Sequence, residues 1–371
     1  MKIRLVIPDV NAIPTERPET CRYCGHWRLH RHGRVAKPIR DHRVPAVIVD
    51  RYKCAGCGRT FRHYPVGVTA QDQSQRTVVL AALLYGLGLS CSAAAAFLTA
   101  LEVRIGRMSV WRDAQVAGEA LRRHRPAGLV QVLGADETVF RVRGHEVVVG
   151  VVVDGQRGTT LGFTVLYGGD AATFLDWLRW YAETLGVEVL VTDGHKAYGV
   201  VATELRLRHQ LCLAHVRKAI SLQIRSIRGQ GRRERADGSP GESLDDDLDE
   251  VAAVLGELPA DGAHRLWQLH GRYRRAMPPR AGEQASPAYR IRMLTLELSE
   301  LWPKLSLAQR RPELGLDGTN NVTERAISKS KVRYKTMRGY KSLEGMSNGI
   351  ALTQWLYTSN AEHDLAQALT A

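Results

Sequence analysis

Residues 129–212 carry a run of patterns that constrains the fold more than any other part of the chain. Three segments rich in β-branched residues, LVQVLGADETVF, EVVVGVVVDG and TTLGFTVLYG, are separated by turns that contain glycine. A helical pattern, DAATFLDWLRWYAETLG, follows them and leads to a buried strand, VEVLVTDG. A helix near 195–205, a short strand near 208–212 and a further helix come next. This order predicts an α/β core built on one sheet.

Three strands, a helix, a strand, a helix and a strand is the element order of a ribonuclease H-like core, in which the first strand is central and the fourth lies beside it. Asp136 closes the apolar run VQVLGAD, and Asp193 closes VEVLVTD. Both are therefore expected at the ends of adjacent parallel strands. Glu324, at the front of a later helix, would supply a third carboxylate. Three carboxylates can hold two Mg²⁺ or Mn²⁺ ions, which activate an attacking hydroxyl and stabilise the leaving oxygen in phosphoryl transfer.

These acids also have simpler explanations. An aspartate at a strand end is usually a turn or cap residue, and the segment starting at Asn321 fits a helix start in which Asn321 caps and Glu324 reaches back to it. Four other acids compete for the same role: Glu137, Asp154, Asp170 and Asp176.

The helix that contains Glu324 is otherwise basic. Residues 321–345 carry seven Lys/Arg against two Glu. Glu324, Lys331 and Lys335 share one helical face, so the lysines could hold phosphates close to the carboxylate. The candidate DNA contacts on this helix are Arg325, Lys329, Lys331, Arg333 and Lys335.

Two C-x-x-C pairs near the amino terminus predict a zinc site. Each pair is followed by glycine, as a tight metal knuckle requires, and four reduced thiolates suit tetrahedral Zn²⁺. The four cysteines are Cys21, Cys24, Cys54 and Cys57. Arginines and aromatic residues surround them, and Arg28, Arg31 and Arg34 are the candidate DNA contacts. The alternative is a solvated face on a purely structural zinc module.

Residues 70–125 predict three helices in the pattern of a helix-turn-helix, with Ser109 capping the last one. Trp111 and Arg112 on that helix are the candidate contacts in a DNA groove. Plain helical packing explains the same pattern.

Charge favours a nucleic-acid partner, and hydropathy argues against a membrane span. The net charge is +14, and residues 1–63 alone carry fourteen Lys/Arg against five Asp/Glu. Two separated basic zones favour a long polyanion, above all nucleic acid. Val78 to Leu101 is uncharged, but its glycines and serines favour two short buried helices over a membrane span. The first residues lack the pattern of a signal peptide. We therefore expect a cytoplasmic, nucleoid-associated protein with no membrane partner.

At the acidic residues the sequence resembles the DDE transposases of bacterial insertion sequences. The segments ADET, TDGHKAY and GTNNVTERAI resemble the three acidic blocks of that superfamily, and HQLCLAHVRKAI resembles its C-x-x-H block. The resemblance implies that Asp136, Asp193 and Glu324 are the catalytic metal ligands. It implies a role near the active site for Cys212 and His215, for which a metal half-site and a buried cysteine beside a satisfied histidine both stay open.

Five regions follow from these patterns. They are a zinc-binding DNA-recognition module at 1–66, a helix-turn-helix region at 67–127, the first part of the ribonuclease H-like core at 128–218, an all-α insertion at 219–317 with an exposed loop at 228–248, and the completion of the core with the glutamate helix at 318–371.

The resemblance implies a DNA transposase that cuts at transposon ends and transfers the 3′-hydroxyl into target DNA. Double-stranded DNA would be its partner, as terminal inverted repeats and as target, and a homodimer or higher oligomer would hold two ends together. Two alternatives remain from the residues alone. One is a catalytically inactive, zinc-dependent DNA-binding regulator, and the other is a related nuclease such as a junction resolvase.

Overall fold

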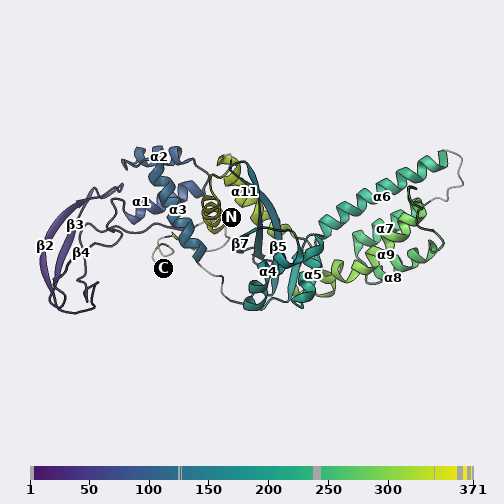
Figure 1. The fold of residues 1–371 in the computed structure, drawn as a ribbon, viewed down its shortest axis with the longest axis horizontal. Helices are drawn as coiled ribbons and strands as arrows, with labels where there is room; N and C mark the ends of the chain where they lie inside the picture. The colour runs from purple at the N-terminus through teal and green to yellow at the C-terminus, as the bar shows by residue number, and fades with distance from the viewer. Residues whose placement is uncertain are drawn as a thin grey trace. The chain divides into compact units, whose positions relative to one another are not determined.

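The computed structural model of the chain describes residues 4–123, 126, 128–236, 244–337, 339–356, 362–365 and 369. The backbone forms two compact units, drawn in Figure 1. Unit 1 comprises Met1–Pro126, Val139–Val147 and Ala326–Ala371, and unit 2 comprises Ala127–Thr138 and Val148–Arg325. Among the described residues, no helix has both the length and the apolar character needed to cross a membrane.

Unit 2 is built on a five-stranded mixed sheet with the order β7-β6-β5-β8-β9. The strands are β5 (Val132–Val142), β6 (His145–Asp154), β7 (Thr160–Leu166), β8 (Val189–Thr192) and β9 (Arg208–Leu211). β6 and β7 pair antiparallel, whereas β8 pairs parallel with both β5 and β9. The first strand is therefore central and the fourth lies beside it. The element order predicted for a ribonuclease H-like core is confirmed.

The strand sequences explain this arrangement. All six residues from Val149 to Asp154 of β6 are buried, as are all four residues of β8. Strands buried on both faces are near-continuous runs of β-branched residues, because neither face meets water.

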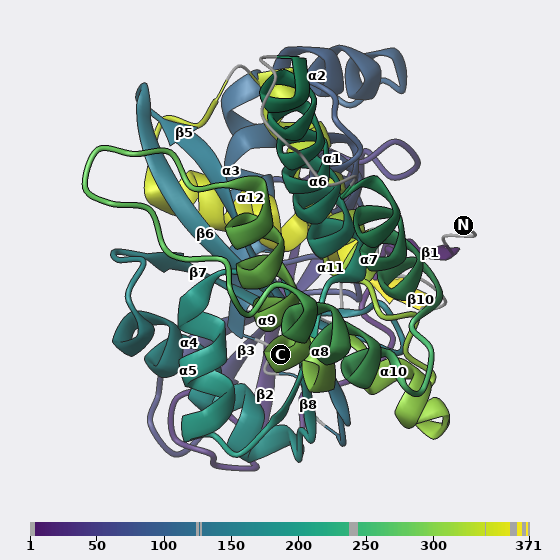
Figure 2. The same cartoon turned by 90° about the vertical axis from the view of Figure 1, so that its right-hand side faces the viewer.

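Two helices in unit 2, α4 (Ala171–Leu185) and α5 (Lys196–Glu204), lie side by side (Figure 2). Asp170 caps α4, since its side chain accepts a hydrogen bond from the Thr173 backbone N–H at 2.9 Å. Phe174 and Trp177 of α4 and Tyr198 of α5 are buried in one apolar cluster with residues of the sheet. Together with the strands, these helices form the α/β core of unit 2.

The all-α insertion of unit 2 begins directly after β9. Its helices lie close together in Figure 1 and share one apolar core. They are α6 (Leu213–Ala236), α7 (Asp245–Glu257), α8 (Gly262–Arg272) and α9 (Pro287–Leu305), followed by α10 (Leu307–Arg310) and a 3₁₀ turn (Pro312–Leu314).

The predicted loop over 228–248 is wrong at both ends, because α6 continues to Ala236 and α7 begins at Asp245. The middle of that loop, 237–243, lies outside the described residues. Charge opposition explains the difference. Arg228 on α6 pairs with Asp245 at 3.0 Å and with Asp249 at 2.6 Å, so charges that suggest a solvated loop instead join two helices.

Unit 1 contains a three-stranded antiparallel sheet of β2 (Leu29–Pro38), β3 (Ala46–Cys54) and β4 (Thr60–His63). A parallel pair, β1 (Arg4–Val6) and β10 (Glu362–Asp364), joins residues near the two ends of the chain. A small apolar cluster lies at the end of the sheet where β3 reaches Cys54, and it includes Cys21, Tyr52 and Phe61.

Unit 1 also contains the three predicted amino-terminal helices, α1 (Gln75–Gly86), α2 (Cys91–Ala100) and α3 (Arg107–Arg123). The uncharged segment Val78 to Leu101 therefore forms two short helices as predicted, but only α1 is mostly buried, since α2 buries only Ala94, Ala95 and Leu98. α1 and α3 pack against α12 (Leu343–Leu356) around a shared core. Ser109 is not a cap. It lies in the first turn of α3, and its backbone N–H bonds to the Gly106 carbonyl at 2.9 Å.

The helix α11 (Asn321–Met337) starts in unit 2, against strand β5. A Cβ atom added at Gly134 would lie 2.4 Å from Thr323 Oγ1 and 2.8 Å from Val153 Cγ2. Both distances are shorter than any normal contact, so only glycine allows the first turn of α11 to lie this close to the sheet.

We expect Gly134→Ala to lower the free energy of unfolding by about 1–3 kcal/mol, because an inserted methyl group forces side chains and backbone to move. Thermal unfolding of the full chain measures this. Gly229→Ala is the matched control, since a Cβ at this helical glycine meets nothing within 4 Å and should stabilise by about 0.5–1 kcal/mol. Equal melting temperatures for Gly134→Ala and the wild type would contradict the close approach.

Candidate active site

Two of the three predicted acidic residues extend from neighbouring parallel strands. The ladder between β5 and β8 ends at the pair Gly134 and Val191. Asp136 and Asp193 each come two residues after that pair, so both backbones reach the same edge of the ladder. Each carboxylate accepts a hydrogen bond from a nearby backbone N–H at 2.9 Å, Asp136 from Glu137 and Asp193 from His195.

The predicted position of Asp136 at a strand end needs correction. β5 continues six residues beyond it to Val142, whereas β8 ends at Thr192. β5 has partners on both sides, and β6 is longer than β8. Asp136 is therefore held within a strand, while Asp193 begins a loop.

The third acid, Glu324, lies in the first turn of α11. Asn320 holds this turn to the sheet. Its side-chain amide donates to the Ala135 carbonyl at 3.2 Å, its side-chain oxygen accepts from the Thr323 hydroxyl at 2.6 Å, and its backbone carbonyl accepts from the Glu324 N–H at 3.1 Å. The side chain that bonds to this turn is thus that of Asn320, and the predicted cap at Asn321 is wrong by one residue.

The charges of neighbouring carboxylates act on Asp136. The pKa of Asp136 is raised to about 7, first by burial and then by the negative charges of Asp193, Glu137 and Glu324. Like charges that share a partly buried site disfavour ionisation, and a divalent cation would remove that cost. Carboxylate oxygens are the ligands that Mg²⁺ prefers.

A fourth carboxylate, Glu137, is close to this group and was ranked only as a rival in the sequence. Burial raises its pKa, and the buried Tyr198 hydroxyl donates a hydrogen bond to it. Two of the other rivals serve local structure instead. Asp154 accepts hydrogen bonds from the Gln156 and Arg157 backbones, and Asp170 caps α4. Asp176 is exposed on α4.

The four amino-terminal cysteines lie together in unit 1. Their sulfur atoms are all within 4.8 Å of one another. Cys21 and Cys57 have Sγ atoms 3.8 Å apart, and those of Cys24 and Cys54 are 3.6 Å apart. Tetrahedral Zn²⁺ with Zn–S bonds of about 2.3 Å places its sulfurs about 3.8 Å apart, so the four thiols fit zinc in both chemistry and spacing.

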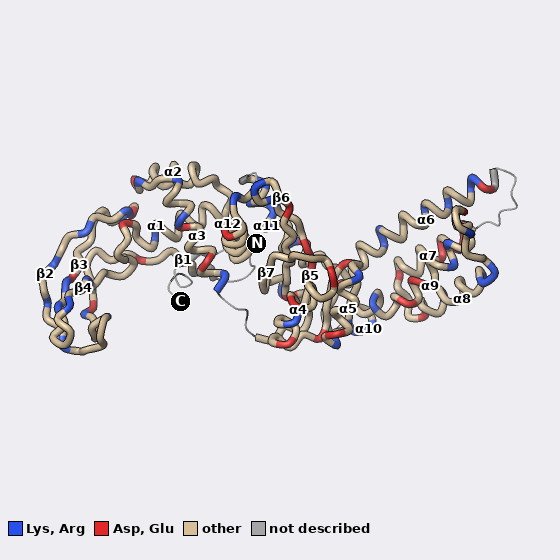
Figure 3. The backbone as a smooth tube through the Cα atoms, viewed as in Figure 1, with Lys and Arg blue, Asp and Glu red and all other residues tan. Residues whose placement is uncertain are grey.

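The predicted DNA-contact residues of the amino-terminal region are accessible. Lys and Arg recur along β2, β3 and β4 (Figure 3), and Arg28 is exposed. Arg31 and Arg34 keep more than half of their side chains exposed while both pair with the buried Asp50, at 3.2 and 2.9 Å.

The basic residues of α11 differ in accessibility. Arg325 and Lys335 are exposed, and Lys329 and Lys331 are half-buried. Arg333 is 1% exposed, its guanidinium lies 3.7 Å from the centre of the Tyr85 ring, and it donates to the Leu89 carbonyl at 2.6 Å. This guanidinium is used inside unit 1, so we remove Arg333 from the set of candidate DNA contacts.

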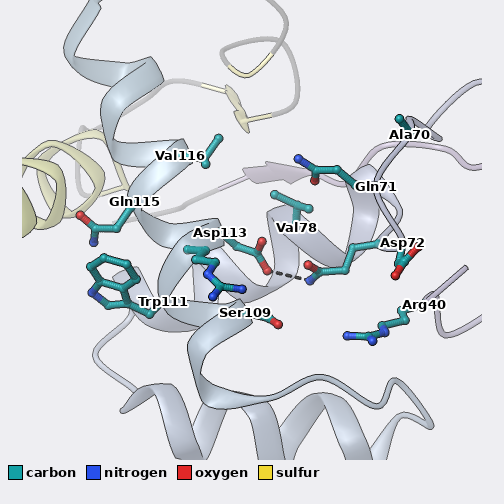
Figure 4. A pocket seen from close by; sticks show the side chains of 12 residues that line it. Arg40, Ala70, Gln71, Asp72, Val78, Ser109, Trp111, Asp113, Gln115 and Val116 are labelled. Carbon is teal, nitrogen blue, oxygen red and sulfur yellow. Dashed lines mark hydrogen bonds between the residues drawn. The ribbon is translucent and has the colours of Figure 1, made fainter.

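Helix α3 borders a hollow of about 660 Å³ in unit 1, shown in Figure 4. The exposed Trp111 and Arg112 line it, together with Arg40 from the segment after β2. Asp113 also lines it and accepts a hydrogen bond from the Gln73 amide at 2.8 Å. Two arginines, Arg40 and Arg112, and two aspartates, Asp72 and Asp113, line this hollow beside the Trp111 ring.

The comparisons with known proteins identify the class. Residues 130–348, more than half of the chain, match the family described as Transposase IS66 family. The chain is thus a transposase-type protein, and it belongs to the IS66 family of transposases. A comparison with curated proteins finds no match.

The chain also matches solved structures, three of which follow. The Drosophila P element transposase strand transfer complex has 11% identity and a TM-score of 0.40, over 80% of this chain and 94% of that chain. The catalytic core domain of BIV integrase has 12% identity and a TM-score of 0.19, over 46% and 99%. The simian T-cell lymphotropic virus intasome in complex with PP2A regulatory subunit B56 gamma has 15% identity and a TM-score of 0.21, over 48% and 69%.

We expect Cys54→Ser to release one Zn²⁺ per chain, because a structural zinc site needs its full set of thiolates. Metal analysis of the purified protein after dialysis measures the loss. Cys91→Ser, at a half-buried thiol in α2 outside the four-cysteine cluster, is the matched control and should keep the wild-type zinc content. Unchanged zinc in Cys54→Ser would contradict the site.

A pH dependence follows from Asp113, whose pKa burial raises to about 6 despite the hydrogen bond from Gln73. Because its folded-state pKa lies above the unfolded value, the stability it contributes is lost as pH rises from about 4 through 6. Asp113→Asn removes this loss. The gain in the free energy of unfolding should be about 1–2 kcal/mol larger at pH 8 than at pH 5.

Thermal unfolding of the full chain at the two pH values tests this prediction. Asp176→Asn, at an exposed position on α4, should change stability by less than about 0.5 kcal/mol at either pH. An equal gain in the free energy of unfolding of Asp113→Asn at pH 5 and pH 8 would contradict the raised pKa of Asp113.

Proposed function

We propose that the protein is a DNA transposase that cuts DNA at the ends of its element and joins the freed 3′-hydroxyl to target DNA. Asp136, Asp193 and Glu324 are the catalytic metal ligands in this proposal. Membership of the IS66 family supports the transposase class. The metal-dependent chemistry is inferred from the site.

One observation carries the proposal. The raised pKa of Asp136 arises from burial together with the charges of Asp193 and Glu324, which come from a different strand and a distant helix. Like charges that act on one partly buried carboxylate cost stability when no cation is bound. A metal site for phosphoryl transfer explains both the convergence and the cost.

This chain's own residues have separate tasks in the reaction. Asp136 is fixed by its strand, and Glu324 by the bonds of Asn320 to the sheet and to the first turn of α11. When bound to these carboxylates, Mg²⁺ would supply charge neutralisation and an activated oxygen nucleophile. Arg325, Lys329, Lys331 and Lys335 hold DNA phosphates on the same helix as Glu324.

Recognition of DNA ends falls to unit 1 in this proposal. The zinc-bound knuckles fix the sheet that carries Arg28, Arg31 and Arg34, and α3 presents Trp111 and Arg112 as the reading helix of a helix-turn-helix. Terminal inverted repeats are double-stranded DNA, so phosphate contacts position the protein and base contacts specify the site. Two ends have to be cut together, which requires a homodimer or a larger assembly.

Labelled DNA fragments from the flanks of this gene test the activity. With Mg²⁺ or Mn²⁺, the wild type should nick and join them, and Asp136→Asn, Asp193→Asn and Glu324→Gln should each lose activity by roughly 10²–10³-fold or more. Asp193→Asn should still bind the ends, because it removes a metal ligand and no DNA contact.

Asp176→Asn is the matched control, since it removes an exposed carboxylate on α4 and should keep full activity. Specific end binding by the wild type without cutting, under any metal condition, would overturn the enzyme and favour a DNA-binding regulator. Metal-dependent cutting without any joined product would favour a nuclease.

A further inference from the structure

A second cluster of metal-ligating side chains lies beside the proposed active site. Cys212 Sγ, His215 Nδ1 or Nε2 and one carboxylate oxygen of Glu324 all lie within 4.8 Å of one another. His215 Nδ1 lies 3.7 Å from Glu324 Oε1. The cluster shares Glu324 with the active-site carboxylates but adds a thiol and an imidazole, which Mg²⁺ chemistry does not use.

The backbone holds these three side chains in place. Cys212 directly follows β9, and its N–H donates to the Thr192 carbonyl at 2.8 Å, next to Asp193. His215 comes three residues later in the first turn of α6, so the two side chains lie on one side of that turn.

The start of α11 is tied to the same place. The Leu213 N–H donates to the Gly318 carbonyl at 2.9 Å, and the Asn320 N–H donates to Cys212 Sγ at 3.2 Å. Gly318 permits this approach, because a Cβ there would lie 2.6 Å from Leu213 Cδ1. These bonds hold the first turn of α11, which carries Glu324, next to Cys212 and the start of α6.

The donor set selects the kind of metal. A thiolate, an imidazole and a carboxylate are the ligands of Zn²⁺ and related borderline cations. Tetrahedral Zn²⁺ with these ligands requires donor atoms about 3.3–3.6 Å apart, close to the 3.7 Å between His215 and Glu324. The buried Cys212 is fixed, whereas the side chains of His215 and Glu324 are 49% and 44% exposed and can adjust. Their exposure also leaves the fourth ligand position open to solvent.

We propose that Cys212, His215 and Glu324 form a site for Zn²⁺ that is separate from the four-cysteine site. A Glu324 carboxylate oxygen that is bound to Zn²⁺ in this site is not available to a metal ion held by Asp136 and Asp193. Zn²⁺ then competes with the catalytic Mg²⁺ and inhibits the enzyme reversibly. Binding of Zn²⁺ at this site does not require the proposed activity, whereas the inhibition rests on the proposed function.

Zinc binding tests the site directly. Full-length protein is titrated with Zn²⁺ against a chromophoric chelator, and the zinc bound per chain is compared between variants. Cys212→Ser and His215→Ala should each bind one Zn²⁺ fewer than the wild type, or bind it with at least about tenfold lower affinity. His145→Ala, at an exposed histidine in β6, and Cys91→Ser are matched controls and should bind as the wild type does.

His215→Ala keeps this test decisive if Cys212→Ser fails to fold, because His215 is half exposed and its loss leaves no buried cavity. Circular dichroism establishes folding for each variant. Wild-type zinc content and affinity in folded His215→Ala would overturn the site.

A second measurement tests the competition. Zn²⁺ is added to the Mg²⁺-supported cutting reaction, and each protein is normalised to its own activity without added Zn²⁺. Half-inhibition of Cys212→Ser should need at least about tenfold more Zn²⁺ than half-inhibition of the wild type. Equal inhibition of both proteins would overturn the competition. Absence of cutting by the wild type in Mg²⁺ alone would overturn the proposed function instead, and the binding titration would still decide the zinc site.

Discussion

The close approach of α11 to strand β5 is the constraint on which the candidate active site depends. Gly134 has no side chain, so Thr323 can lie where a Cβ would otherwise be. Asn320 then bonds to the Ala135 carbonyl, one residue before Asp136. Through these contacts, a helix more than 180 residues away in sequence contributes its first carboxylate to the edge of the β5–β8 ladder. Without this approach, Asp136 and Asp193 would have no third carboxylate from α11 near them.

The site is assembled at an energetic cost. Burial and neighbouring negative charges raise the pKa of Asp136 to about 7, so this carboxyl group resists ionisation near neutral pH. Glu137 shares this environment, and Tyr198 donates a hydrogen bond to it. Functional sites often store such a cost, because the ligand that removes it is bound more tightly. In the proposed function, the same carboxylates would bind the divalent cation.

The strand and helix order of the core could be predicted from the sequence, because β-branched runs and helical periodicity are local signals. The errors occur where distant contacts decide. β5 extends past Asp136 because β6 pairs with it, and Arg228 extends α6 by pairing with α7. Arg333 resembles a solvated base in sequence, yet Tyr85 and Leu89, far away in the chain, bury it. Asn320 and Asn321 are chemically identical, and only the sheet beneath them distinguishes their roles.

The division of unit 1 along the chain has a consequence for how the protein is made. α3 leaves the ribosome early, but its partner α12 follows after roughly 220 further residues, which take roughly 10–45 s to synthesise. Asn348 of α12 bonds to Gln115 and Arg122 of α3, and Leu352 and Leu356 complete the core around Val79. Until then, the apolar faces of α1 and α3 stay uncovered while unit 2 is already being completed. The core that α1 and α3 share with α12 can therefore be completed only near the end of synthesis, after all the residues of unit 2 have been made.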